Sequence, residues 1–245
     1  MDNSATFTFY GSLNDFLPRA KREMQLLYRF AGAPAVKDAI EALGVPHPEV
    51  AVILINEKPV GFYHSLQPGD TVAVYPAGWR EFFPADFSLR SGEAAPEKFV
   101  LDVHLGRLAR ALRMLGFDSC YRNDYTDQDI AHIAQSENRT VLTRDVGLLK
   151  QKSIQWGYWL RSQHLEAQLQ EVITYFNLQD RLQPFSRCIA CNGTITEVPK
   201  ESVIAQLPPK TRLYFHEFYQ CTGCNRVYWK GSHYDRMQRI IEHWI

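Results

Sequence analysis

Two Cys-x-x-Cys pairs near the end of the chain constrain its fold more than any other feature. Cys188 and Cys191 form the first pair, and Cys221 and Cys224 form the second, with 29 residues between the pairs. The short spacing lets both thiolates of a pair bind one ion from a single turn, and a glycine such as Gly193 suits that turn. Four thiolates predict a closed, tetrahedral zinc site that stabilises a small ribbon of strands.

Disulfide bonds and a bound iron ion are the alternatives for these four thiols. The chain starts without a basic stretch followed by an apolar one, so we expect no signal peptide and a cytoplasmic protein, in which thiols stay reduced. Its longest apolar run, Val50–Ile55, is far shorter than the roughly 18 residues of a membrane span, so no membrane association is expected. Cys120 lies in a predicted strand and is expected to be an inert core thiol.

The composition indicates a folded chain with an uneven distribution of charge. Of the 245 residues, 45% are hydrophobic, which fits a globular protein with a sizeable core. The 27 basic and 27 acidic residues cancel, but residues 181–245 carry 9 Lys and Arg against 5 Asp and Glu. The last quarter of the chain is therefore electropositive, which is a mild indication of a polyanionic partner.

Residues 1–78 predict a β-grasp domain. Strands and one helix follow in the order strand, strand, helix, strand, strand, over Thr6–Tyr10, Gln25–Phe30, Val36–Leu43, Val50–Ile55 and Thr71–Tyr75. Within this part, the segments VKDAIEALGVPHPEV and LQPGDTVAVYP resemble the ubiquitin-like sulfur carriers. The sulfur carriers end in a free Gly-Gly, whereas this chain continues past Gly78, so we expect a docking or regulatory module for a protein partner. Residues 79–96 are expected to form an irregular linker.

Residues 97–180 alternate between strand and helix patterns. The expected elements are the strands Phe99–Val103, Ser119–Arg122, Thr140–Thr143 and Gln155–Leu160 and the helices Leu105–Leu115, Thr126–Glu137, Val146–Lys152 and His164–Phe176. This alternation predicts a mostly parallel sheet with helices on both faces. Residues 181–245 would then carry the ribbon and a last helix over Tyr234–Trp244.

Three carboxylates are expected to meet at one edge of that parallel sheet. Asp102 lies in an otherwise apolar strand, Asp145 follows the strand Thr140–Thr143, and Asp127 is in the first turn of a helix. Carboxyl ends of parallel strands and the helices that follow them share one edge, where α/β proteins bind ligands. Clustered carboxylates suit Mg²⁺ or Mn²⁺, which orients water for cleavage of a phosphodiester. Taken singly, Asp127 and Asp145 also fit helix-capping roles.

Other polar residues suggest roles around this edge. Asp124 is a tentative fourth ligand, while Asp129 is expected to cap a helix with Thr126. Arg107 and Arg144 lie close in sequence to Asp102 and Asp145 and suit phosphate oxygens. Arg113, in contrast, is expected to lie on a solvated helix face.

The ribbon combines basic and aromatic residues. Lys230 follows Tyr228 and Trp229 directly and His233 lies three residues further on, a combination that suits phosphate contacts and base stacking in single-stranded RNA. Packing of a small module explains Trp229 at least as well, and helix capping at the start of the last helix competes with a binding role for His233.

The segments FVLDVHLGRLARALRMLGFDSCYRNDYTDQDI, TVLTRDVGLLK, CIACNG and FYQCTGCNRVYWKGSHYDRM together resemble the Mut-seven C-terminal RNase family, in the form that carries an N-terminal ubiquitin-like domain. The resemblance covers nearly the whole chain. It implies a PIN-like nuclease fold with a zinc ribbon, RNA as substrate, and an acidic site at Asp102, Asp127 and Asp145. The alternatives are an RNA-binding protein that does not cleave, and an adaptor that acts through residues 1–78.

Overall fold

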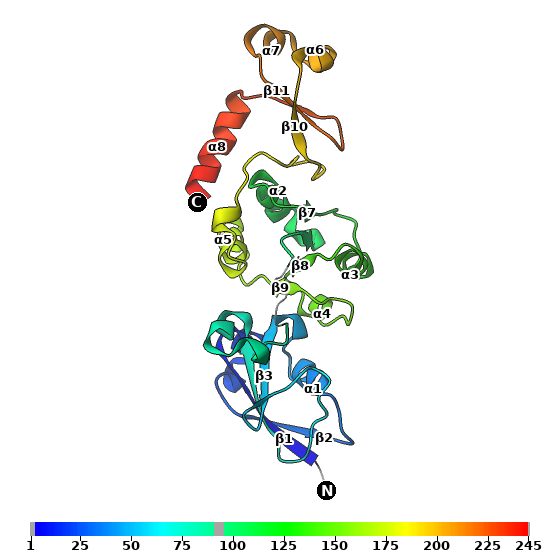
Figure 1. Ribbon diagram of the computed structural model, residues 1–245, viewed down its shortest axis with the longest axis vertical. Helices are drawn as coiled ribbons and strands as arrows, with labels where there is room; N and C mark the ends of the chain where they lie inside the picture. Colours follow the sequence, from blue (N-terminus) through cyan, green and yellow to red (C-terminus); the bar gives the residue numbers. More distant parts are fainter. Residues whose placement is uncertain (1–2, 91–95, 245) are drawn as a thin grey trace. The chain divides into compact units, whose positions relative to one another are not determined.

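The computed structural model describes residues 3–90 and 96–244 (Figure 1). The chain divides into two compact units. The first comprises Met1–Pro96 and Ala134–Trp159, and the second comprises Glu97–Ile133 and Leu160–Ile245.

The first unit contains a five-stranded sheet with the strand order β2-β1-β5-β3-β4. Its strands are β1 (Asn3–Phe9), β2 (Leu26–Phe30), β3 (Val50–Ile55), β4 (Lys58–Pro59) and β5 (Thr71–Pro76). The strands β1 and β5 run parallel in the middle of the sheet, and the other neighbours are antiparallel. This is the topology of a β-grasp domain, as the sequence predicts.

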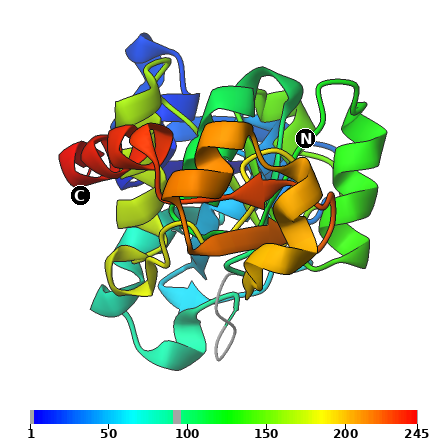
Figure 2. The same ribbon diagram turned by 90° about the horizontal axis from the view of Figure 1, so that it is seen from above.

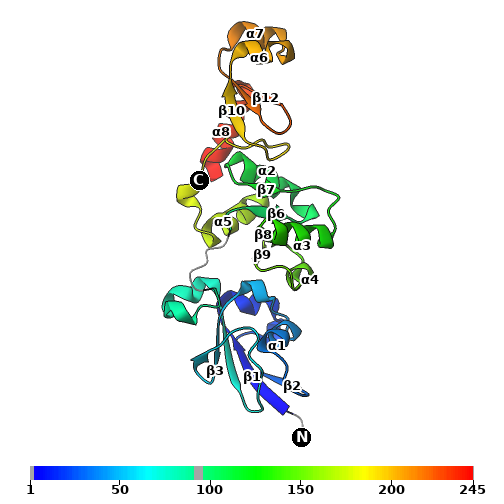
Figure 3. The same cartoon turned by 45° about the vertical axis from the view of Figure 1, so that its right-hand side comes forward.

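Helix α1 (Val36–Ala42) lies against this sheet because its apolar residues face one way (Figure 3). Val36, Ala39 and Ile40 are fully buried and share one core with Phe7 and Val74 from the parallel strands. After the helix, Gly44 adopts a φ of 119°, a left-handed conformation that favours glycine. The helix ends one residue before the predicted Leu43, and β3 has the predicted boundaries Val50–Ile55.

The expected irregular linker is partly ordered in its described residues. It contains the 3-10 helices η4 (Ala77–Phe82) and η5 (Ala85–Phe87). After them the N–H of Leu89 donates to the carbonyl of Ala51 at 2.9 Å, beside an irregularity in the pairing of β3 with β5. Aromatic packing explains this order, since the ring of Tyr75 lies 4.4 Å from that of Tyr10 and 4.7 Å from that of Phe83. Residues 91–95 of the predicted linker lie outside the described residues.

Two parallel strand pairs belong to the α/β part of the chain. In the first unit, β8 (Thr140–Thr143) pairs with β9 (Gly157–Trp159), and the short helix α4 (Val146–Leu149) connects them. In the second unit, β6 (Phe99–Leu101) pairs with β7 (Ser119–Cys120) through the amphipathic helix α2 (Gly106–Met114). Helices α3 (Asp127–Ser136) and α5 (Leu165–Tyr175) complete the strand and helix alternation that the sequence predicts.

The ribbon in the second unit is a three-stranded antiparallel sheet of β10 (Ile195–Val198), β11 (Phe218–Cys221) and β12 (Val227–Tyr228). Two short helices, α6 (Lys200–Val203) and α7 (Pro209–Tyr214), separate β10 from β11 and lie beside the ribbon strands (Figure 2, orange). Val203 and Leu207 pack on the buried ring of Phe218 to form a small core. The last helix, α8 (Ser232–Trp244), begins two residues before the predicted start.

Candidate functional site

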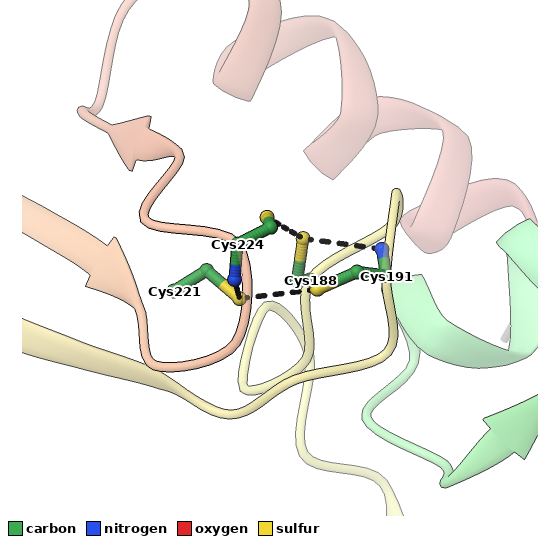
Figure 4. Close-up of side chains that lie close together, drawn as sticks. All are labelled: Cys188, Cys191, Cys221 and Cys224. Atoms are coloured by element: carbon green, nitrogen blue, oxygen red, sulfur yellow. Dashed lines mark hydrogen bonds between the residues drawn. The ribbon is translucent and has the colours of Figure 1, made fainter.

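The four paired cysteines form one cluster (Figure 4). The Sγ atoms of Cys188 and Cys224 are 3.6 Å apart, those of Cys191 and Cys221 are 3.3 Å apart, and all four lie within 4.8 Å of one another. A disulfide bond has a length of about 2.05 Å, so none joins these four residues. Sulfurs around a tetrahedral zinc ion are about 3.8 Å apart, because each Zn–S bond is about 2.3 Å. The cluster could therefore hold a zinc ion.

Both cysteine turns direct backbone N–H groups at sulfur. The N–H of Cys191 lies 3.5 Å from the Sγ of Cys188, and the N–H of Cys224 lies 3.5 Å from the Sγ of Cys221. A Cβ atom at Gly193 would lie 2.8 Å from the Sγ of Cys221, so the first turn requires glycine. Hydrogen-bond donors that face a sulfur favour its thiolate form, which is the form that binds metal.

The pKa values of two thiols in the cluster are shifted in opposite directions. Burial raises the pKa of the Cys188 thiol, but hydrogen bonds from the Tyr228 hydroxyl and from the backbone outweigh it and lower this pKa to about 6. Burial and the nearby sulfurs of Cys221 and Cys224 raise the pKa of Cys191 to about 12. Four thiolates at these distances repel one another, and a bound divalent cation compensates that repulsion.

A buried arginine attaches the first cysteine turn to the α/β part. Arg113 in α2 donates from Nε to the carbonyl of Ser119 at 2.9 Å, and from Nη1 to the carbonyls of Ile189 at 3.3 Å and Ala190 at 3.1 Å. Its exposed fraction is 4%, and burial lowers its pKa. The prediction of a solvated Arg113 is therefore wrong, because this side chain supports a turn 76 residues away in sequence.

Asp102 lies directly after a strand rather than within one. The strand β6 ends at Leu101, so the predicted strand over Phe99–Val103 is two residues too long. The carbonyl of Asp102 accepts the N–H of Leu105 at 2.9 Å and begins the 3-10 helix η6 (Val103–Leu105). The residue is 7% exposed, which places a buried carboxylate at the carboxyl end of a parallel strand.

Asp127 and Asp145 each begin a helix and are exposed. Asp127 is the first residue of α3, and Asp145 precedes α4. The Oδ1 atom of Asp145 accepts the N–H of Gly147 at 2.6 Å, so Asp145 is an N-cap, but two carboxylate oxygens offer about four lone pairs and leave room for a metal ion. Asp102 and Asp127 lie in one compact unit and Asp145 in the other, so their meeting stays a prediction.

The neighbouring acidic residues have local partners. Asp129 and Thr126 form the expected capping box, with the Thr126 N–H donating to Asp129 Oδ2 at 2.8 Å and the Asp129 N–H to Thr126 Oγ1 at 3.2 Å. Asp124 accepts two hydrogen bonds from Arg122, at 2.9 and 2.7 Å. The guanidinium group of Arg122 therefore occupies both carboxylate oxygens of Asp124, the predicted fourth ligand.

A basic cavity of about 1060 Å³ lies in the second unit, between the first turns of α2 and α5 and one face of α8. Arg107, which the sequence singles out, lines it from α2. The other charged or titratable lining residues are His164, Glu166, Arg236, Arg239 and His243. Three guanidinium groups against one carboxylate make this a suitable surface for phosphate groups. Sequence analysis did not connect the arginines of α8 with Arg107.

The other predicted binding residues have different surroundings. Lys230 and His233 both line a second cavity, beside the ribbon. The Nζ atom of Lys230 lies 2.8 Å from Glu217 Oε2, and this contact is the main cause that raises the pKa of Lys230 to about 12. Arg144 is exposed directly before Asp145, and its carbonyl accepts the indole N–H of Trp159 at 3.1 Å.

The first unit contains a junction between the β-grasp part and residues 134–159 that sequence analysis missed. Its centre is Glu49, which is 1% exposed and accepts the N–H of Trp159 at 2.6 Å. Beside it, the imidazole of His47 contacts the carbonyl of Ile154 at 2.8 Å. Arg90 lies 4.3 Å from the centre of the Trp156 ring. The β-grasp part therefore packs on the strand and helix segment that carries Asp145.

Replacement of Glu49 by Ala is expected to loosen this junction, because the partly buried N–H of Trp159 loses its acceptor. Such a loss costs about 1–3 kcal/mol, which corresponds to roughly 5- to 150-fold faster exchange of amide hydrogens in residues 140–159. Hydrogen exchange followed by mass spectrometry measures this rate. The Glu49→Gln variant keeps an acceptor and serves as the control. Equal protection in Glu49→Ala and the unaltered protein would contradict the role given to Glu49.

These features define the class of the protein: a β-grasp domain joined to an α/β domain that carries a ribbon with a cluster of four cysteines. A family model described as the Mut7-C RNAse domain matches residues 97–241, and one described as Mut7-C ubiquitin matches residues 2–80. The first match covers more than half of the chain, which therefore belongs to the Mut7-C RNAse family. Searches of curated proteins and of solved structures find no match.

The family match confirms the resemblance seen in the sequence and suggests a nuclease-type role. It also confirms the order of a ubiquitin-like domain followed by the Mut7-C domain. Within residues 3–90 and 96–244, no helix is both long and apolar enough to cross a membrane.

Proposed function

We propose that the protein is a metal-dependent ribonuclease that cleaves RNA phosphodiesters. The observation that carries the proposal is the buried carboxylate of Asp102 at the carboxyl end of β6, in a domain that matches the Mut7-C RNAse model. Asp127 and Asp145 begin the helices α3 and α4 and would share a Mg²⁺ or Mn²⁺ ion with Asp102. The proposal requires that these three carboxylates meet at the edge of the parallel sheet where the carboxyl ends of its strands lie.

In this mechanism, the three carboxylates would hold the ion, and Arg107 and Arg144 would bind the substrate. When bound, the ion would polarise a water molecule and stabilise charge on the phosphoryl oxygens. The guanidinium groups of Arg107 and Arg144 are exposed and suited to orient the phosphodiester. The basic cavity that Arg107 lines would extend this contact along the RNA backbone.

We propose further that the cysteine cluster binds zinc in a structural role. The four thiolates of the cluster would fill all four positions around a tetrahedral ion, which would leave no position for substrate. A zinc site of this kind needs reduced thiols, which supports a cytoplasmic location.

Metal removal tests the proposed reaction. We expect labelled single-stranded RNA to be cleaved with added Mg²⁺ or Mn²⁺, to stay intact in EDTA, and to be cleaved again once Mn²⁺ is restored, because EDTA competes with the three carboxylates for the ion. Gel electrophoresis measures the product. Zinc content measured in the same EDTA-treated sample is the control, since loss of zinc would confuse the result. Cleavage at an undiminished rate in EDTA, with zinc retained, would contradict metal dependence.

The second candidate is an RNA-binding protein that does not cleave. The basic cavity favours it, because the cavity can bind phosphate groups without the three carboxylates. RNA binding in the presence of Mg²⁺ and of Mn²⁺, with no cleavage product formed with either ion, would support this candidate. The ubiquitin-like domain suggests in addition an interaction with a protein partner.

A further inference from the structure

A half-buried aromatic cavity lies beside the ribbon, in the second unit. Its volume is about 640 Å³, within the range of cavities that bind ligands of nucleotide size. Five aromatic residues from three segments of the chain line it: Phe185, Tyr219, Tyr228, Trp229 and Tyr234. None of the five is fully buried. Trp229 also packs against the small core of the ribbon around Phe218, as the packing alternative for this residue expects.

Close contacts hold the lining side chains of the cavity in place. The hydroxyl group of Tyr228 lies 3.0 Å from the Sγ of Cys188, so the cysteine cluster fixes this ring. A Cβ atom at Gly231 would lie 3.0 Å from the Nε1 atom of Trp229, so glycine lets the indole lie against the chain. Phe185 adopts a φ of 64°, which is unfavourable for an aromatic residue, and its ring lies 4.6 Å from that of Tyr234.

The charged residues that line the cavity are basic, which favours an anionic ligand. Arg187, Arg226, Lys230 and His233 line the cavity, and no Asp or Glu is among the lining residues. Arg226 and His233 are exposed, while Lys230 pairs with Glu217, so a phosphate group would compete with that carboxylate. Rings that form the walls and cations at the rim suit a planar base attached to a phosphate backbone.

We infer that this cavity binds a base of single-stranded RNA, stacked on its aromatic rings, while the adjacent phosphates contact Arg226 and Lys230. The inference rests on the proposed function in taking RNA as the substrate. It assigns to the ribbon a specific contact with the bases, in addition to the attraction of its net positive charge for phosphate.

Binding of a matched abasic strand tests the inference without any variant. The probe is a fluorescein-labelled single-stranded RNA of about ten nucleotides, within the site sizes of single-strand-binding folds. Its partner has the same phosphates but no bases, and both are titrated with the full chain without added Mg²⁺ or Mn²⁺. We expect the strand with bases to bind about 5- to 100-fold more tightly, as measured by fluorescence anisotropy. Equal affinity for the two strands would overturn the inference.

Two pairs of variants assign the effect to the cavity. Tyr234→Leu is expected to lose the preference for bases, whereas Tyr234→Phe keeps the ring and the preference. Arg226→Gln is expected to weaken binding of both strands alike, and more than Lys210→Gln, which removes the same charge outside the cavity. Zinc content and thermal stability show whether Tyr234→Leu is folded. A folded Tyr234→Leu protein that still prefers bases would overturn the assignment.

Failure of this inference and failure of the proposed function give different results. Equal binding of the two strands together with Mn²⁺-dependent cleavage would remove the base site and leave the ribonuclease. Preference for bases without cleavage in any metal would leave the base site and remove the ribonuclease.

Discussion

RNA cleavage is expected to fall by at least about a hundredfold when Asp102 or Asp145 is replaced by Asn, because each change removes a charged oxygen from the proposed metal site. Asn has nearly the same shape as Asp, so the buried position of Asp102 stays filled. At position 145 Asn remains a good N-cap, so helix α4 keeps its start. Initial rates with labelled RNA and Mn²⁺ measure the effect.

The control for these variants is Asp180→Asn, which removes one exposed carboxylate from the same family-matched region. This variant is expected to cleave RNA at the rate of the unaltered protein. Affinity for RNA, measured without divalent ions, should change little in all three variants, since the carboxylates contribute through the ion. Undiminished cleavage by folded Asp102→Asn and Asp145→Asn would remove these residues from the site and with them the proposed mechanism.

Local patterns in the sequence predict the elements that depend on near neighbours. Three such features are found as expected: the cluster of the four paired cysteines, the capping box of Thr126 and the strand Val50–Ile55. The end of β6 differs, because the apolar residue Val103 continues the pattern of a strand while its backbone already turns. A 3-10 turn of three residues carries no periodicity that separates it from a strand end.

Long-range contacts explain what the sequence could not show. Arg113 continues the spacing of Arg107 and Arg110, which recur at every third position of α2, yet its guanidinium is buried against carbonyls 76 and 77 residues away. The junction of Glu49 with Trp159 joins residues 110 positions apart. The cavity beside the ribbon likewise depends on Phe185, whose left-handed backbone no propensity scale predicts. Each of these features is fixed by tertiary packing rather than by local preference.

Loss of zinc and of the ribbon fold is the expected result of Cys221→Ser. Structural zinc sites of this type contribute about 10–16 kcal/mol of apparent binding free energy, more than a small module without a large core can replace. The core of this ribbon is small, formed around Val203, Leu207 and Phe218. Elemental analysis is expected to give about one zinc per chain for the unaltered protein and none for the variant.

The matched control is Cys120→Ser, because Cys120 is a half-buried thiol outside the cluster, 3.2 Å from the hydroxyl of Tyr125. It should retain its zinc. Since Tyr228 contacts Cys188 and also lines the aromatic cavity, the loss of zinc should in addition abolish the preference for RNA bases. Arg113 binds the first cysteine turn to α2, so the disturbance should reach β7 as faster amide exchange at Ser119 and Cys120. A Cys221→Ser protein that keeps one zinc, or a folded unaltered protein without metal, would refute the structural zinc site.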